Sequence, residues 1–499
     1  MHQGHRCDCC LSRRQCLRYI GSAALATGLI GDALEPAVAS PKGAVGPADV
    51  IDPTTLRPRP RVRIAAAILQ LPRPYWLGWP GTTYDLDKHQ AEYLGMLRKS
   101  AETVGFDLGL EAKPIQDEAG MTALLNRVKE QKPDGLLVIL QHMGCWGWAE
   151  RLANEAGVPL IVFSPVGTSF TGHVLGISRR QGVHVVSSLE WSAVEDALRM
   201  VRAKRLFEES RILWIQGNQT GETVLDRLGT KVRQIPRDTF NLRFDKTPAG
   251  EEVRAVAATA RKHAKRIVEP SVRDSENSAR ALVTAKQLLA EHKSNALSMD
   301  CLGMVGSKLV PTPPCYAWTQ LQDLGVTAGC EADLFGAVSL LFSSYLLNRP
   351  GYMNDPVAET AKNLLVASHC TSGTRIAGFD KPAAPYVLRN HSESALGVST
   401  QVIWPVGQPT TLIRFNSPHE VIVDSGTVVG NVNTPPAGGC RTCIEVKMDA
   451  VEDARDVQGF HQVVTLGNHK RMIDAFCQMY GIRVIRSPER APTADEVAS

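Results

Sequence analysis

The sequence predicts an α/β protein in which two doubly wound parallel-sheet domains are followed by a β-rich, antiparallel and barrel-like C-terminal domain. Up to about residue 350, short apolar runs alternate with segments of helical apolar spacing, which is typical of a parallel sheet covered on both faces. From about residue 385, short strands follow one another with turn residues between them, which indicates an antiparallel sheet or barrel. A chain of 499 residues is also too long for a single hydrophobic core.

These patterns divide the chain into six parts. We expect a leader at 1–39, a linker rich in Pro, Ala and Gly at 40–60, a first α/β domain at 61–170, a second at 171–350, a β-rich domain at 351–487 and a disordered tail at 488–499. The composition, 43% apolar and 21% charged, is that of ordinary globular material.

The leader has the pattern of an export signal. Arg13 and Arg14 form the core of SRRQCLR, a mildly apolar segment follows at 19–34, and residues 37–39 (AVA) form a small-x-small cleavage motif. We therefore expect export to the periplasm by the twin-arginine route, with Ser40 as the first mature residue. The alternative is the basic start of a helix. Because the twin-arginine route carries folded proteins, it suits a protein that binds a cofactor before export.

The first α/β unit shows the alternation of strands and helices most clearly. The apolar runs at 62–69, 135–140 and 158–163 predict buried strands. The helical spacing between them predicts helices at 87–104 and 148–156.

The second unit repeats the pattern. We place its start at a strand predicted at 183–186, and it continues with a helix at 191–204, strands at 211–215 and 295–299, and a buried helix at 332–347. The turn GNQTGET within this unit lacks the GxGxxG spacing, so an ordinary turn explains it better than a phosphate site does.

The C-terminal part has a different rhythm. Its short predicted strands lie at 398–404, 410–415, 420–423, 427–432 and 443–448. A helix at 468–480 and a strand at 482–485 follow.

Composition excludes several classes of partner. The net charge of +4 is small for this length and no Lys/Arg-rich run stands out in the body of the chain, so we expect no nucleic-acid partner. No internal apolar run has the length of a membrane span, so we expect no membrane anchor. The pair Cys440-x-x-Cys443 is too few ligands for a zinc site by itself, and a local disulfide or two buried thiols explain it better.

Candidate metal ligands are spread over the second half of the chain. Glu331 lies in GCEADLFGA, Asp355 in GYMNDP, His369 in ASHCT and His461 in GFHQVV. Taken alone, each carboxylate is explained better as a helix cap than as a ligand. Taken together, two carboxylates and an imidazole make an oxygen-rich site that suits Mn²⁺ or Mg²⁺ better than a closed zinc site.

The order of the motifs carries a family resemblance. Glu331 and Asp355 are followed by HCT at 369–371, NHSES at 390–394 and HQVVTLGNH at 461–469. In this order the motifs resemble the L-fucose isomerase and L-arabinose isomerase superfamily, most clearly between residues 299 and 485.

The resemblance implies a cofactor, site residues and an assembly. It implies Mn²⁺, or another divalent cation, held by Glu331, Asp355 and His461. It makes His369 a ligand or a substrate contact, and His391 a substrate contact or a structural residue. It further implies a homo-oligomer, a trimer or hexamer, with a small sugar as substrate.

The expected activity is the metal-dependent interconversion of an aldose and a ketose through an enediol. The proton on the carbon is weakly acidic, so a metal must polarise the carbonyl group and a carboxylate must take the proton. Glu331 and Asp355 are the residue types for this work. Three alternatives remain open: an exported carbohydrate-binding protein, an epimerase or lyase that forms the same enediolate, and a paralogue without activity.

Overall fold

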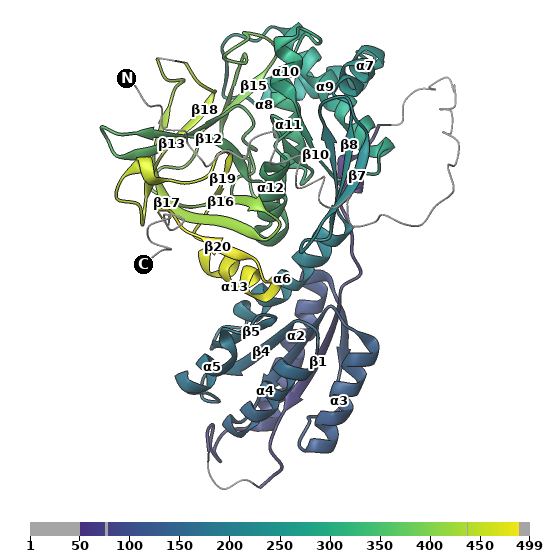
Figure 1. Ribbon diagram of the computed structural model, residues 1–499, viewed down its shortest axis with the longest axis vertical. Helices are drawn as coiled ribbons and strands as arrows, with labels where there is room; N and C mark the ends of the chain where they lie inside the picture. The colour runs from purple at the N-terminus through teal and green to yellow at the C-terminus, as the bar shows by residue number, and fades with distance from the viewer. Residues whose placement is uncertain (1–49, 75–77, 437, 489–499) are drawn as a thin grey trace, which may run out of the picture.

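The computed structural model describes residues 50–74, 78–436 and 438–488. The expected leader at 1–39, the linker residues 40–49 and the tail from 489 lie outside the described residues, so the export signal and the tail stay predictions. The described part contains two α/β sheets and a C-terminal antiparallel β-barrel (Figure 1). This confirms the fold class expected from the sequence. No helix among the described residues combines the length and apolarity needed to cross a membrane.

The first sheet is entirely parallel, in the order β2-β1-β3-β4-β5. Its strands are β1 (Arg63–Leu69), β2 (Asp107–Leu110), β3 (Gly135–Leu140), β4 (Leu160–Pro165) and β5 (Val183–Ser188). The helices around it are α2 (Leu86–Ser100), α3 (Glu118–Gln131), α4 (Trp146–Glu155), α5 (Thr171–Ser178) and α6 (Ser192–Glu209), with the short helices η2 (Ala101–Gly105) and η3 (Met143–Cys145). The short helix η1 (Pro53–Leu56) instead packs against the core of the second sheet.

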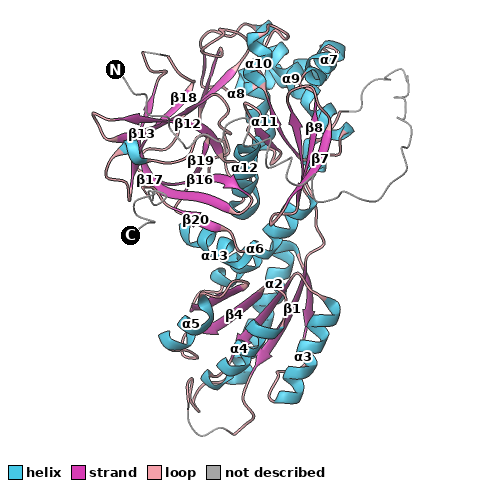
Figure 2. Cartoon of the chain, viewed as in Figure 1, coloured by secondary structure: helices cyan, strands magenta, loops and turns pink. Residues whose placement is uncertain are grey.

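Helices cover both faces of this first sheet (Figure 2). Ile64 and Ile68 of β1 pack in one core with residues of α2 and α6. Ala67 and Leu69 of the same strand pack in another core with residues of α3 and α4. Because side chains alternate across a strand, burial on both faces requires the near-continuous apolar runs that the sequence shows.

The second sheet has the order β11-β10-β6-β8-β7. Its strands are β6 (Arg211–Ile215), β7 (Gly221–Leu225), β8 (Thr230–Ile235), β10 (Ala296–Met299) and β11 (Thr327–Gly329). Its helices are α7 (Asp238–Lys246), α8 (Glu251–His263), α9 (Val272–Glu291), α10 (Cys301–Gly306), α11 (Cys315–Asp323) and α12 (Leu334–Leu347). All its pairs are parallel except that of β7 with β8.

Six antiparallel strands close into the barrel in the order β16-β19-β12-β13-β18-β17, with β17 pairing back onto β16. They are β12 (Tyr352–Glu359), β13 (Leu364–His369), β16 (Pro409–Ser417), β17 (Glu420–Val432), β18 (Thr442–Met448) and β19 (Gln462–Leu466). Around the barrel lie β9 (Arg266–Ile267), β14 (Tyr386–Arg389), β15 (Ser399–Val402), η4 (Ala454–Asp456), α13 (Lys470–Tyr480) and β20 (Arg483–Ile485).

Two expected elements need correction. The strand placed at the start of the second unit, β5, instead pairs in parallel with β4 and is the edge strand of the first sheet. The two strands expected at 420–423 and 427–432 are one strand, β17, which has a register shift between Val428 and Gly430. The turn residues at 424–426 had suggested a break, but they stay paired with residues 410–412 of β16, and the bulge comes after them without ending the strand.

An aromatic cluster joins the barrel to the α/β layers. The ring of Phe342 on α12 lies 6.1 Å from that of Phe207 on α6, 5.2 Å from that of Phe415 on β16 and 5.1 Å from that of Phe476 on α13. All four side chains are fully buried. Helix α12 is therefore held in place by neighbours from three parts of the chain, and the residues just before it, Glu331 and Asp333, belong to the site described next.

Candidate metal centre

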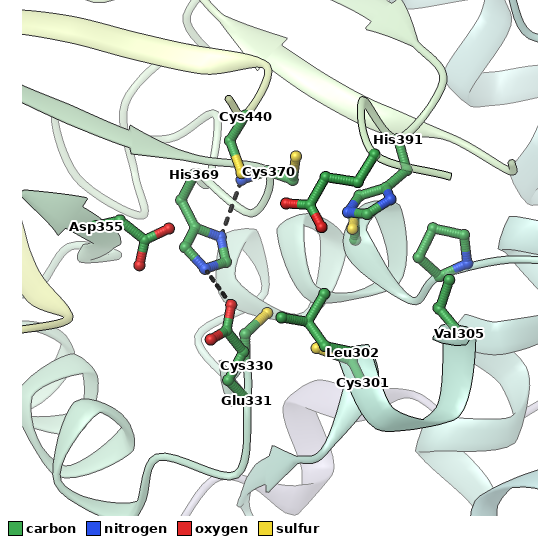
Figure 3. A pocket seen from close by; sticks show the side chains of 13 residues that line it. Cys301, Leu302, Val305, Cys330, Glu331, Asp355, His369, Cys370, His391 and Cys440 are labelled. Atoms are coloured by element: carbon green, nitrogen blue, oxygen red, sulfur yellow. Dashed lines mark hydrogen bonds and ion pairs between the residues drawn. The ribbon is translucent and has the colours of Figure 1, made fainter. Parts of the chain in front are cut away.

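Four of the residues singled out in the sequence meet at one end of the barrel. Glu331, Asp355, His369 and His461 each offer one ligand atom, and these atoms all lie within 4.8 Å of one another. Figure 3 shows Glu331, Asp355 and His369 turned toward one another from separate segments. The structure thus brings together residues that are up to 130 positions apart in the chain, as 461 minus 331 gives.

The barrel places three of the four side chains. Strand β12 lies between β13 and β19, and Asp355 of β12 pairs with Ser368 of β13. His369 is the last residue of β13, and His461 directly precedes β19, whose first residue pairs with Asn354. Neighbouring antiparallel strands therefore present all three groups at the same end of the sheet. Asp355 lies inside strand β12 and caps no helix, so the capping explanation does not apply to it.

The second α/β sheet supplies Glu331. The residue follows β11, at the carboxyl end of a parallel strand, where ligand sites of open α/β sheets usually lie. The segment is fixed on both sides of the next residue, because the N–H of Ala332 donates to the carbonyl of Met299 at 2.9 Å and the indole N–H of Trp214 donates to the carbonyl of Ala332 at 2.6 Å.

The backbone is strained at two of the candidate ligands. Glu331 has φ of 57° and His461 has φ of 53°, and Ala332 has φ of 53°. The left-handed region is unfavourable for residues other than glycine, by roughly 1–3 kcal/mol each, and such residues gather at functional sites. The surrounding hydrogen bonds hold a conformation that aims both side chains at the centre.

His461 is oriented by Asp333, a residue that the sequence analysis did not select. The Nδ1 atom of His461 donates to Oδ2 of Asp333 at 2.9 Å, and the guanidinium of Arg414 donates to the same oxygen at 2.5 Å. Asp333 is also the N-cap of α12, where its side chain accepts from the N–H of Gly336. With Nδ1 engaged, the Nε2 atom of His461 faces Glu331 and Asp355 at 3.3 and 3.2 Å.

The charges at the site shift two pKa values strongly. Burial lowers the pKa of His461, but hydrogen bonds to Asp333, Asp355 and Glu331 outweigh it and raise the pKa to about 11. Burial raises the pKa of Glu331, but hydrogen bonds from His369 and His461 outweigh it and lower the pKa to about 2. Without a cation, a protonated His461 thus balances the carboxylates, and a bound cation would take over that role.

The donor atoms fit a hard divalent cation. Oδ1 of Asp355 and Nε2 of His461 are buried and lie 3.2 Å apart as an ion pair, but neither atom makes a well-aligned hydrogen bond. Buried polar atoms without partners are rare and call for a ligand or water. Carboxylate oxygens with one imidazole suit Mn²⁺ or Mg²⁺, and a carboxylate behind the imidazole is the usual support for a metal-binding histidine.

His369 presents a different face to the site. Its Nδ1 accepts from the backbone N–H of Cys370 at 2.9 Å, so in the neutral ring the proton lies on Nε2. That Nε2 lies 3.6 Å from Oε1 of Glu331. In this tautomer His369 offers a hydrogen-bond donor to the site, which suits a substrate contact better than a metal ligand.

His391 does not join the four-residue cluster. It lines the cavity beside Glu331, Asp355 and His369, on the side opposite them. Its Nδ1 lies 3.0 Å from Oγ of Ser394. The cavity is about 30 Å³, which is room for one or two water-sized groups. Five cysteines line it together with these residues: Cys301, Cys315, Cys330, Cys370 and Cys440.

The sequence analysis missed two further groups. Asp333 could have been found from its place two residues after Glu331 at a helix start, because Asp is a preferred N-cap. The ring of Phe460 lies 4.1 Å from that of His461 and its side chain is 54% exposed, so it forms an apolar surface beside the site. The pair Cys440 and Cys443 contains free thiols and no disulfide.

Comparison with known proteins gives a limited but consistent result. No family model matches the chain. Over 141 residues the chain is 25% identical to a sulfoquinovose isomerase of Clostridium sp. (strain MSTE9), a match that covers 28% of this chain. The chain spans 31% of the length of that curated relative. The chain is therefore similar, over a limited stretch, to a sugar isomerase.

A solved structure shares only a weak likeness. It is an ABC transporter solute-binding protein from Burkholderia multivorans, 11% identical, with a TM-score of 0.17, and the match covers 50% of this chain and 85% of that one. A likeness this low carries no argument about fold or function.

Proposed function

We propose that the protein is a metal-dependent sugar isomerase that interconverts an aldose and a ketose through an enediol. The observation that carries the proposal is the convergence of Glu331, Asp355 and His461 within 4.8 Å, with Asp333 behind the histidine. The similarity to a sulfoquinovose isomerase supports the same class of reaction. When bound, the cation would polarise the sugar's carbonyl group and stabilise negative charge on its oxygen.

In this proposal the carboxylates work at the open side of the centre. The side chains of Glu331 and Asp355 are 26% and 32% exposed, whereas that of His461 is 4% exposed. A sugar can therefore approach the carboxylates, and the histidine remains a fixed support. One carboxylate takes the proton from the sugar carbon and returns it to the neighbouring carbon, which is general acid–base chemistry.

In this proposal His369 acts on the hydroxyl group of the sugar. Its Nε2 points to the same space as Glu331 and can donate to a sugar oxygen. Phe460 adds an exposed ring next to His461, and aromatic rings pack well against the apolar face of a sugar. The proposal thus assigns a metal-holding side, a proton-transfer side and a sugar-packing side to one small region.

The test is a metal-dependence assay on the full chain. The protein is stripped with a chelator, Mn²⁺ or Mg²⁺ is added back, and ketose formation is followed from L-fucose, D-arabinose, L-arabinose and sulfoquinovose. Ketose formation that disappears on stripping and returns with the cation is the expected result. A folded, metal-loaded protein that forms no ketose from any of these sugars contradicts the proposal. Release of an epimer or a dehydrated product instead would replace isomerisation by another enediolate reaction.

A further inference from the structure

A second cluster of potential ligands lies across the cavity from the first. The Sγ atoms of Cys315 and Cys370 and one ring nitrogen of His391 all lie within 4.8 Å of one another. The three side chains are buried, with exposed fractions of 5%, 2% and 5%. Two sulfurs and an imidazole at this spacing form a soft donor set, unlike the oxygen-rich set around Glu331.

Each of these residues is held by a separate element. Cys315 begins α11, and the N–H of the next residue donates to the carbonyl of Val398 at 3.1 Å. Cys370 directly follows β13, and its N–H donates to Nδ1 of His369. His391 begins a closed turn, in which its N–H donates to the carbonyl of Leu396 at 3.0 Å. The cluster is therefore built from fixed backbone.

The orientation of His391 leaves a nitrogen for a ligand. Its Nδ1 lies 3.0 Å from Oγ of Ser394, so Nε2 is the nitrogen left for a ligand. A metal-binding histidine usually has its other nitrogen engaged in this way, because the second contact fixes the ring. Ser394 therefore fixes the ring of His391 as Asp333 fixes the ring of His461.

A third cysteine lies beside Cys370, outside the group of three donor atoms that are all within 4.8 Å of one another. Cys440 lines the same cavity, and in Figure 3 its sulfur lies beside Cys370. Three sulfurs and one imidazole nitrogen are a common ligand set of tetrahedral zinc.

We propose that the protein has a second metal site, for Zn²⁺ or a similarly soft cation, formed by Cys315, Cys370, Cys440 and His391. Binding requires the thiols to lose their protons, which pass to solvent as the metal–sulfur bonds form. No electron transfer is involved. The proposal is independent of the isomerase activity.

The two sites are linked through consecutive residues. His369 faces the Glu331 cluster and Cys370 faces the thiol cluster, and the hydrogen bond from the N–H of Cys370 to His369 couples their positions. Because the donor sets differ in hardness, Mn²⁺ or Mg²⁺ and Zn²⁺ would sort between them. A soft metal would thus fix the end of β13, which carries His369, without occupying the oxygen-rich centre.

Cobalt is the probe that distinguishes the two sites. Co²⁺ is added to the full chain after chelator stripping, under a phosphine reductant and with Mn²⁺ present. Coordination by thiolates gives strong near-ultraviolet charge-transfer absorption, and coordination by carboxylates does not. We expect this absorption to rise to a plateau at one Co²⁺ per thiol cluster and to disappear when Zn²⁺ is added. Absence of the absorption in reduced, folded protein overturns the proposal.

Variants locate the site. Cys370→Ser is expected to abolish the charge-transfer absorption, and the matched control Cys477→Ser, a buried free thiol on α13, is expected to retain it. Absorption that survives in Cys370→Ser contradicts the assignment. If Cys370→Ser does not fold, X-ray absorption of the zinc-loaded wild-type protein decides, because sulfur neighbours at about 2.3 Å are expected and only oxygen or nitrogen neighbours overturn the site. The proposal is also overturned if protein purified without reductant contains a disulfide among these cysteines and binds no zinc once that disulfide is reduced.

Discussion

The Nδ1 atom of His461 lies 2.9 Å from Oδ2 of Asp333, and this contact decides which nitrogen of the histidine faces Glu331 and Asp355. Asp333 is the N-cap of α12, whereas His461 belongs to the barrel, so the contact also ties the α/β layers to the barrel at the site. Arg414 of β16 stabilises the negative charge of Asp333 through an ion pair. The orientation of one candidate ligand thus depends on three segments of the fold.

Asp333→Asn tests this relationship. Asn keeps the N-cap of α12 but removes the charge behind His461, so we expect the affinity for Mn²⁺ to fall by about 10–100-fold. The measurement is a Mn²⁺ titration by calorimetry. Asp424→Asn is the control, because Asp424 is buried and hydrogen-bonded to Ser487 on another part of the barrel. An Asp333→Asn protein that binds Mn²⁺ like the wild type would show that the contact does not support the metal.

Glu331→Gln tests the proton-transfer role. The amide keeps the shape of the side chain but cannot take a proton, so we expect kcat at saturating Mn²⁺ to fall by roughly 10²–10⁴-fold. The assay is ketose formation with the metal content of each sample measured alongside. Glu420→Gln, an exchange at a surface ion pair with Arg483, is the control and should leave kcat unchanged. Near-normal turnover by the Glu331→Gln protein with metal bound would remove Glu331 from the chemistry.

The pH dependence of metal binding follows from His461. Burial lowers the pKa of His461 in the metal-free protein, but hydrogen bonds to the neighbouring carboxylates outweigh burial and raise it to about 11. At neutral pH a cation must therefore displace the proton of His461. Proton competition weakens as pH rises, and the affinity for Mn²⁺ should therefore increase with pH, by up to about tenfold per pH unit for one proton. Titrations at pH 6, 7 and 8 measure this slope. An affinity that is constant over this range would mean that no proton leaves His461.

Phe342→Ala tests the packing that positions α12. Phe342 is fully buried among Phe207, Phe415 and Phe476, and its removal leaves a cavity at the junction of three parts of the chain. We expect the free energy of unfolding to fall by about 3–5 kcal/mol. Leu189→Ala, at a side chain that is 81% exposed, should change it by less than about 0.5 kcal/mol. Chemical denaturation compares the two. A loss below about 1 kcal/mol for Phe342→Ala would place the stabilising contacts elsewhere.

The sequence predicted the fold class because its two signals are local. A strand buried on both faces must be apolar along its length, as at 135–140, and the short C-terminal strands carry turn residues at their ends. Partnership between strands is not local. The assignment of β5 to the first sheet depends on its pairing with β4, and nothing within 183–188 encodes that neighbour.

The candidate ligands were found in the sequence from their residue types and order, and the structure places Glu331, Asp355, His369 and His461 together. Their separate roles remain proposals. What the sequence did not provide is the support around them. Asp333 is recognisable as a helix cap from its position, but its second contact, to His461, crosses from α12 to the barrel. The cysteine cluster combines four distant segments, so no local motif predicts it.

Hydrogen exchange at the sugar is the most direct test of an enediol-forming isomerase. The Mn²⁺-loaded protein is incubated in D₂O with the sugar from which it forms ketose, and carbon-bound deuterium is followed by NMR. We expect the ketose to form and to carry deuterium at C1, because the proton held by a carboxylate exchanges with solvent. Both ketose formation and deuterium incorporation should vanish after chelation. Ketose without deuterium would indicate direct hydride transfer and contradict the role of the carboxylates. If the metal-bound protein forms no ketose from any sugar, the proposed function itself is contradicted.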